Sequence, residues 1–152
     1  MIKDYGSAHP LPDAAMQPDK NIQYKLLFDV TKAPKEPGKP TPGLDHLARL
    51  INLFETAGIP AHDMRLVAVI HGDATPGVLK EEYYQEQAQG ENPNLDLLHA
   101  LKQSGVQLFV CGQSLVQQGY GDSWVSEDVS VALSALSVLS TLQMMGYALM
   151  PY

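Results

Sequence analysis

Cysteine and positive charge are both scarce in this sequence of 152 residues. Cys111 is the single cysteine, so an internal disulfide and a zinc site built from several thiolates are both excluded. Ten Lys and Arg residues stand against seventeen Asp and Glu residues, which gives a formal net charge of −7. Such a balance lacks the basic surface of a general nucleic-acid binder and gives no attraction to anionic lipid. We therefore expect neither nucleic acid nor a membrane as a partner.

Long apolar runs and targeting signals are missing as well. The first residues, MIKDY, do not form the charged head and apolar run of a secretory signal. The most apolar stretch, 129–152, is interrupted by Ser, Thr and Gln and falls short of the roughly 20 apolar residues that span a membrane. We expect a cytoplasmic protein as the sequence stands, and a periplasmic or otherwise exported one if a signal peptide once preceded residue 1.

Enough apolar material is present for one folded domain. Hydrophobic residues make up 45% of the chain, which excludes global disorder, and the length suits a single domain. Residues 1–23 hold three prolines and show no periodicity, so we expect an extended arm there, laid across a neighbouring surface. The remaining residues, 24–152, are expected to form a single α/β domain.

Apolar strands and helices alternate along that domain. We expect strands at 24–30, 66–70, 106–110 and 147–150. We expect helices between Pro42 and Gly58, over 78–91, from Asn92 to Gly105, from about Ser114 to Gly119, and over 126–145. This alternation predicts an α/β fold with a mostly parallel sheet.

The last 24 residues, 129–152, contain no charged side chain. A helix at the surface of a small domain normally keeps one charged face toward water. We therefore expect the final helix to be buried on two sides, against the sheet and against another subunit. The alternative is a serine-rich face that is open to solvent.

Cys111 stands where an α/β protein most often places its chemistry. It ends an apolar strand, Gly112 follows, and a helix begins near Ser114. Backbone N–H groups at a helix start stabilise an anion and lower the pKa of a thiol, whose thiolate is the nucleophile. The alternative is a small buried side chain at the end of a core strand.

Four separate motifs together resemble the DsrE/DsrF-like family, which includes the YchN-like proteins. They are Val110-Cys111-Gly112-Gln113-Ser114-Leu115 with Gly119, then Val69-Ile70-His71-Gly72, then Asn92-Pro93-Asn94-Leu95 before Gly105-Val106, and the terminal stretch Ala135…Leu142-Gln143…Gly146-Tyr147-Ala148…Pro151. Together the motifs span about residues 24–152, and their order and spacing make the resemblance specific.

The resemblance implies a three-layer α/β/α sandwich and a homo-oligomer, a trimer or a hexamer. It also implies that Cys111 accepts sulfane sulfur as a persulfide and passes it on, with sulfur donor and acceptor proteins as partners. No phosphate-binding loop of the Walker or Gly-x-Gly-x-x-Gly type occurs, and we expect no cofactor.

Other residues are expected to complete the site. His71 follows a strand, so it belongs at the same sheet edge as Cys111 and is expected to assist by hydrogen bonding or proton transfer. Gly72, Gly112, Gln113 and Ser114 are candidates for stabilising the anion, and Asn92 and Asn94 for supplying amide donors, although a helix cap and a turn explain the two asparagines as well. No ligand spacing for a metal appears among the histidines, and we expect no metal site.

Two further functions remain open at this point. One is a non-catalytic oligomeric module that binds a small ligand, with Cys111 only lining the pocket. The other is a redox sensor, which would need an intermolecular partner because the chain has no second cysteine.

Overall fold

A five-stranded sheet forms the centre of the molecule. The structure, a computed structural model, describes residues 1–88 and 90–152. All neighbouring strands are parallel, in the order β4-β3-β2-β1-β5. The strands are β1 (Lys25–Val30), β2 (Arg65–Ile70), β3 (Gln107–Cys111), β4 (Ser130–Ala132) and β5 (Ala148–Pro151).

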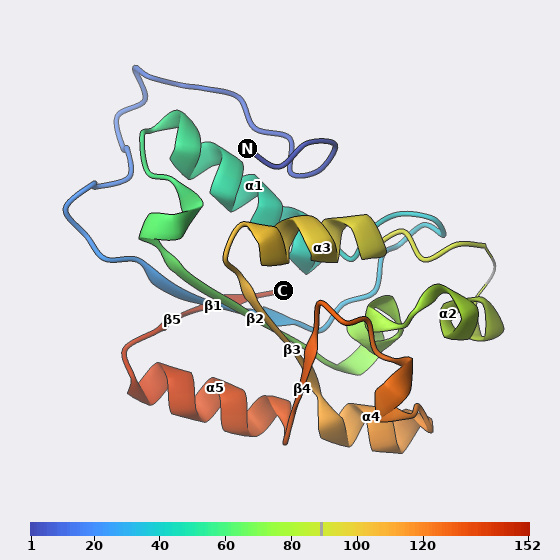
Figure 1. The fold of residues 1–152 in the computed structure, drawn as a ribbon. Coiled ribbons are helices and arrows are strands. Elements are labelled where there is room, and N and C mark those ends of the chain that lie inside the picture. Colours follow the sequence, from blue (N-terminus) through green and yellow to red (C-terminus); the bar gives the residue numbers. More distant parts are fainter. Residues whose placement is uncertain (89) are drawn as a thin grey trace.

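Helices cover both faces of this sheet, which confirms the expected three-layer α/β/α sandwich. Helices α1 (Pro42–Thr56) and α3 (Leu95–Gln103) lie on one face, and α5 (Ala135–Met144) and α4 (Gly112–Gln118) lie on the other side (Figure 1). A short α2 (Glu81–Gln87) lies beyond the carboxyl ends of the strands. Three 3-10 segments complete the chain: η1 (Ala61–Asp63), η2 (Gly72–Val78) and η3 (Asp122–Trp124).

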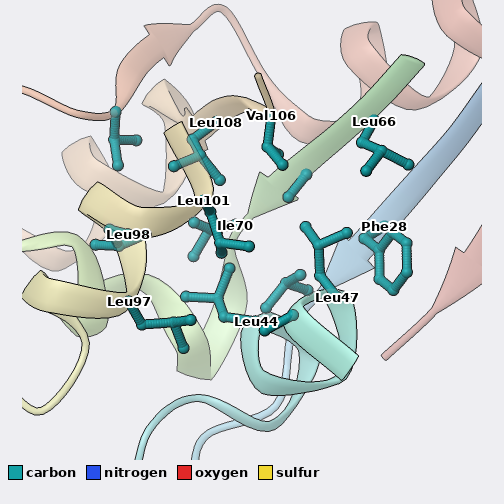
Figure 2. Packing of buried hydrophobic residues seen from close by; sticks show 14 of the residues in the cluster. Phe28, Leu44, Leu47, Leu66, Ile70, Leu97, Leu98, Leu101, Val106 and Leu108 are labelled. Atoms are coloured by element: carbon teal, nitrogen blue, oxygen red, sulfur yellow. The ribbon is translucent and has the colours of Figure 1, made fainter. Parts of the chain in front are cut away.

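Alternation along the strands divides the apolar residues between two cores. Phe28, Leu66, Ile70 and Leu108 face α1 and α3 and pack with Leu44, Leu47, Leu97, Leu98 and Leu101 (Figure 2). The intervening residues Leu27, Val67, Val69 and Cys111 form a second cluster with Ala135 of α5. Because both faces are covered, the central strands are apolar at nearly every position, as expected of a parallel sheet.

The expected long helix over residues 126–145 is wrong. Residues 130–132 form the edge strand β4 beside β3, and α5 begins only at Ala135. Its start is fixed by Ser134, whose hydroxyl accepts the Ser137 N–H at 2.9 Å, while the Ser137 hydroxyl lies 3.2 Å from the Ser134 N–H. This reciprocal cap satisfies two N–H groups that a helix start leaves free, and it sets the boundary that apolar content alone did not show.

The start of the N-terminal arm packs on its own domain. The buried Asn52 of α1 accepts a hydrogen bond from the Ile2 N–H and donates to the carbonyls of Ile2, Tyr5 and Gly6. The other expected strands and helices are present within a few residues of their predicted bounds. The helix expected over 78–91 is shorter, and Gln89 lies outside the described residues.

Candidate functional site

Three polar side chains meet at the carboxyl edge of the sheet. Asp29 lies near the end of β1, His71 follows β2, and Cys111 ends β3, which are adjacent strands. In the register, Asp29 pairs with Val69, and Val69 pairs with Phe109. Because side chains alternate between faces, Asp29, His71 and Cys111 all belong to the face that α5 covers. Ligands in open α/β sheets bind at this edge.

Cys111 caps the helix that follows it. Its Sγ accepts the backbone N–H of Ser114 at 3.4 Å, and the residue is 5% exposed. Burial raises the pKa of the thiol, but four nearby polar groups act in the opposite direction. They are the Ser114 hydroxyl and the N–H groups of Ser114, Ala135 and Gln113, and together they bring the pKa of Cys111 below its ordinary value. The thiolate therefore forms more readily than in an ordinary cysteine, despite burial.

The donors around this sulfur come from the starts of two helices. Ser114 and Gln113 lie in the first turn of α4, and Ala135 is the first residue of α5. The positive ends of both helix dipoles therefore face the thiol. A glycine allows this close approach, because a Cβ at Gly112 would lie 2.6 Å from the carbonyl oxygen of Ala132. Gln113 also joins α4 to the segment before α5, since its Nε2 donates to the Leu133 carbonyl at 3.1 Å.

His71 is held by a partner that sequence reasoning missed. Its Nε2 lies 2.5 Å from Oδ1 of Asp29 on the neighbouring strand, and both side chains are largely buried. No hydrogen bond joins His71 to Cys111 within residues 1–88 and 90–152, so the histidine is oriented by the carboxylate rather than by the thiol. The only signal for Asp29 in the sequence is a carboxylate that follows the apolar run Leu26-Leu27-Phe28 within a strand.

Gly72 ties this edge to α4. Its N–H lies 3.5 Å from the Ser114 hydroxyl, and its carbonyl accepts the Gln118 Nε2 at 3.2 Å. Its φ of 59° lies in the left-handed region, which glycine adopts without strain. Through Ser114, two successive hydrogen bonds thus connect the turn after β2 with the thiol.

The two predicted asparagines lie at the Gly77 end of the η2 segment. Asn92 uses both Nδ2 hydrogens on the carbonyls of Gly77 and Leu79, at 3.0 and 2.8 Å. Asn94 accepts the Thr41 N–H at 2.7 Å and donates to Asn92 Oδ1 at 3.1 Å. None of these bonds reaches Cys111 or His71. The structure therefore brings Cys111, Gly112, Gln113, Ser114, Gly72 and His71 together, and places Asn92 and Asn94 apart from them.

Large apolar side chains are exposed around the thiol face. Leu133 and Leu136 are 76% and 79% exposed, and the remaining members of this set are Val116, Met144 and Met145. They lie on α4, on α5 and on the segments that flank α5, in or next to the charge-free stretch 129–152. Single exposed apolar residues are ordinary, whereas several in one charge-free stretch are unusual for the surface of a monomer.

Residues 1–88 and 90–152 show neither a cluster of metal ligands nor a membrane-spanning helix. No group of three or more His, Cys, Asp or Glu side chains gathers there in a way that would hold a metal ion. In the same residues, none of the helices combines the length and the apolar character that crossing a bilayer requires.

Comparison with known proteins gives one family and a shared fold. The model of the DsrE/DsrF-like family matches residues 25–152. A protein of unknown function from Methanobacterium thermoautotrophicum superimposes with a TM-score of 0.60 at 17% identity, covering 86% of this chain and 100% of that one. The YchN protein of E. coli gives a TM-score of 0.60 at 16% identity with the same coverage. No curated protein matches the sequence.

Proposed function

Because this chain belongs to the DsrE/DsrF-like family, which is associated with sulfur relay, we propose that Cys111 accepts a sulfane sulfur as a persulfide and passes it to an acceptor. The observation that carries the proposal is the set of donors around the sulfur. Three backbone N–H groups and the Ser114 hydroxyl lower the pKa of Cys111. A preformed set of donors of this kind stabilises an anion without reorganisation.

The chemistry needs no oxidant. The Cys111 thiolate attacks the outer sulfur of a donor persulfide, the S–S bond of the donor breaks, and the donor leaves as a thiolate. A new S–S bond now carries the sulfur on Cys111. The acceptor thiolate then attacks that outer sulfur and restores the Cys111 thiolate. Each step exchanges one thiolate for another, so the redox state is conserved.

Burial of the thiol fits a carrier that presents its cargo outward. Cys111 is only 5% exposed, but the persulfide places its outer sulfur about 2 Å farther from the protein. The inner sulfur stays within the donors of α4 and α5, and the outer sulfur becomes the reachable atom. His71, oriented by Asp29, is the residue at the same edge that would exchange a proton with the leaving thiolate.

The exposed apolar set supports a homo-oligomer as part of the proposal. Leu136 on α5 and Leu133 just before it have no covering layer within the described chain, and no charged residue follows Val129. A second copy of the same chain would cover this surface, and the family resemblance favours a trimer or a hexamer. The sulfur donor and acceptor would be further proteins that reach the Cys111 edge.

The test is the intact mass of the reduced protein after incubation with a small-molecule persulfide donor. Wild type is expected to gain one or more sulfur atoms, removable by reductant, and Cys111→Ser is expected to gain none. A matched control moves the single thiol to the exposed end of α1, in the double variant Cys111→Ser with Thr56→Cys. That variant is expected to load more slowly near pH 7, because its thiol lacks the donors that lower the pKa.

One observation favours a second function. The low exposure of Cys111 also suits a thiol that only fills space beneath α5 in a ligand-binding module. Wild type that alkylates no faster than the Thr56→Cys control near pH 7, and that gains no sulfur, would favour this function over relay.

A further inference from the structure

A cavity of about 450 Å³ is lined in part by η2 and does not include the thiol. Its walls come from the loop 33–38, from η2 and from α2, together with Thr41 and Asn94, the residues that immediately precede α1 and α3. Neither Cys111, His71 nor Ser114 lines it. Its size lies in the range of small-molecule sites. The Gly72 end of η2 contacts α4, whereas the Gly77 end forms part of the cavity.

The inner wall carries two polar groups that remain available. Thr41 is 1% exposed, and its hydroxyl makes no hydrogen bond within residues 1–88 and 90–152, not even as a helix cap. No side-chain polar atom in that part of the chain is both fully buried and unpartnered, so the Thr41 hydroxyl must reach the cavity that the residue lines. Asn94 is 2% exposed and uses one of its two Nδ2 hydrogens on Asn92.

These two groups lie together at one point of the wall. A Cβ added at Gly77 would lie 2.9 Å from Asn94 Nδ2 and 3.0 Å from Thr41 Oγ1. Both residues also stand at helix starts, where the dipoles of α1 and α3 make the wall electropositive. Two donors that converge in this way match an oxygen with two lone pairs, such as a carbonyl oxygen.

The remaining walls are apolar, with charges of both signs at the rim. Pro34, Pro37 and Pro76 line the cavity together with the ring of Tyr84. Burial raises the pKa of the Tyr84 phenol and Glu81 adds to this effect, so the ring is uncharged near pH 7. Lys35 stands beside Glu36 and Asp73 among the lining residues, so the cavity does not carry the excess of positive charge that a polyanion would need.

We propose that this cavity binds a small organic molecule whose carbonyl oxygen, from a carboxamide or a carboxylate, accepts hydrogen bonds from Thr41 and Asn94 and whose apolar body lies against the prolines and Tyr84. This site is separate from the proposed persulfide site. The protein would then hold a ligand against η2, at a site that the thiol does not line.

The test is a two-dimensional NMR titration of the ¹⁵N-labelled full chain with benzamide, benzoate and benzylamine in turn. The three probes share a ring, but only the first two carry a carbonyl oxygen, and they separate the carboxamide from the carboxylate. We expect saturable shifts of the backbone amides of Thr41, Gly77, Tyr84 and Asn94 with benzamide or benzoate, and none with benzylamine.

Variants of Thr41 connect these shifts to the inner wall. Thr41→Val keeps the shape and removes the hydroxyl, and it is expected to weaken binding about five-fold, the effect of one neutral hydrogen bond. Thr41→Ser keeps the hydroxyl and should retain the affinity. Thr56→Val, at the exposed end of α1, and Cys111→Ser should bind like wild type.

Three results would overturn the proposal. They are the absence of saturable shifts with both carbonyl probes up to their solubility, shifts confined to residues away from the cavity, and equal affinity of the Val and Ser variants at position 41. Retained persulfide loading in Thr41→Val would show at the same time that the thiol site is unaffected.

Discussion

The two faces of the sheet differ in how far they are completed within one chain. The core that α1 and α3 cover belongs to a cluster of twenty-four buried residues, counted over residues 1–88 and 90–152. On the α5 face the corresponding cluster has five, and one of them is Cys111. The first face is closed by two helices and the start of the arm, whereas the second is covered by a short helix whose outer side exposes Leu136.

The two faces therefore contribute differently to the stability of the fold and to the thiol site. The α1/α3 face holds most of the apolar area that is removed from water, so it accounts for most of the hydrophobic stabilisation. The α5 face has fewer buried residues, but it holds the thiol, the convergent helix starts and the exposed apolar set. The thiol and the donors around it are therefore built on the less complete face.

Leu98→Ala is expected to give the largest effect. Leu98 is fully buried in the α1/α3 core, and its truncation should lower the free energy of unfolding by about 3–4 kcal/mol. Leu139→Ala, in the partly buried layer on α5, should cost only about 1 kcal/mol. Urea unfolding of both variants at one protein concentration measures the contrast. Equal losses would mean that the two faces contribute alike.

Asn92→Ala is expected to lower the free energy of unfolding by about 2–3 kcal/mol, because it leaves the carbonyls of Gly77 and Leu79 without donors. Persulfide loading of Cys111 should be retained in the folded fraction. Unchanged stability combined with lost loading would instead place Asn92 in the sulfur site, as the sequence motif suggested.

Leu136→Lys tests whether the exposed α5 face contributes to assembly and not to the stability of one chain. The side chain is 79% exposed, so the free energy of unfolding at low protein concentration should change by no more than about 0.5 kcal/mol. The mass measured by light scattering should nevertheless fall toward that of one chain. Leu11→Lys, a similarly exposed leucine in the arm, serves as the control and should leave the mass unchanged. Oligomers that persist in Leu136→Lys would show that α5 is not the interface.

Ser114→Ala is expected to give the smallest effect, and only below the ordinary pKa of cysteine. Removing the hydroxyl deletes one of the donors that lower the pKa of Cys111, so the pKa rises and less thiolate is present near pH 7. Alkylation by iodoacetamide should slow about three-fold there and should recover once pH exceeds both pKa values. Ser140→Ala, on the exposed side of α5, should match wild type throughout. A uniform slowing at all pH values would point to a change in access instead.

Sequence patterns predicted the elements whose periodicity is strong. The three apolar strands β1, β2 and β3, and helix α1 with its residues spaced by three and four, are all present. The end of β3 also placed Cys111 at the carboxyl edge beside the start of α4. The charge-free stretch predicted a last helix covered by the sheet on one side and by another subunit on the other. α5 packs on the sheet and exposes Leu136 and Met144, and its cover by another subunit stays a prediction.

The remaining features depend on contacts between distant residues. Residues 129–134 carry apolar and small polar side chains that suit a strand or a helix, and pairing with β3 decides in favour of β4. The Asp29–His71 pair depends on the register of β1 against β2, which no single segment specifies. The same holds for Asn52, whose four hydrogen bonds reach residues nearly fifty positions away.

The most direct test of the central claim is a single round of sulfur transfer. Wild type loaded with persulfide and freed of donor would be mixed with a fresh small-molecule thiol, and the intact mass of the protein would be followed with time. If Cys111 relays sulfur, wild type is expected to lose the mass of one sulfur atom while the acceptor gains it, and Cys111→Ser is expected to transfer none. A wild-type protein that never loads, or one that loads and then keeps its sulfur in the presence of the acceptor, would contradict a relay through Cys111.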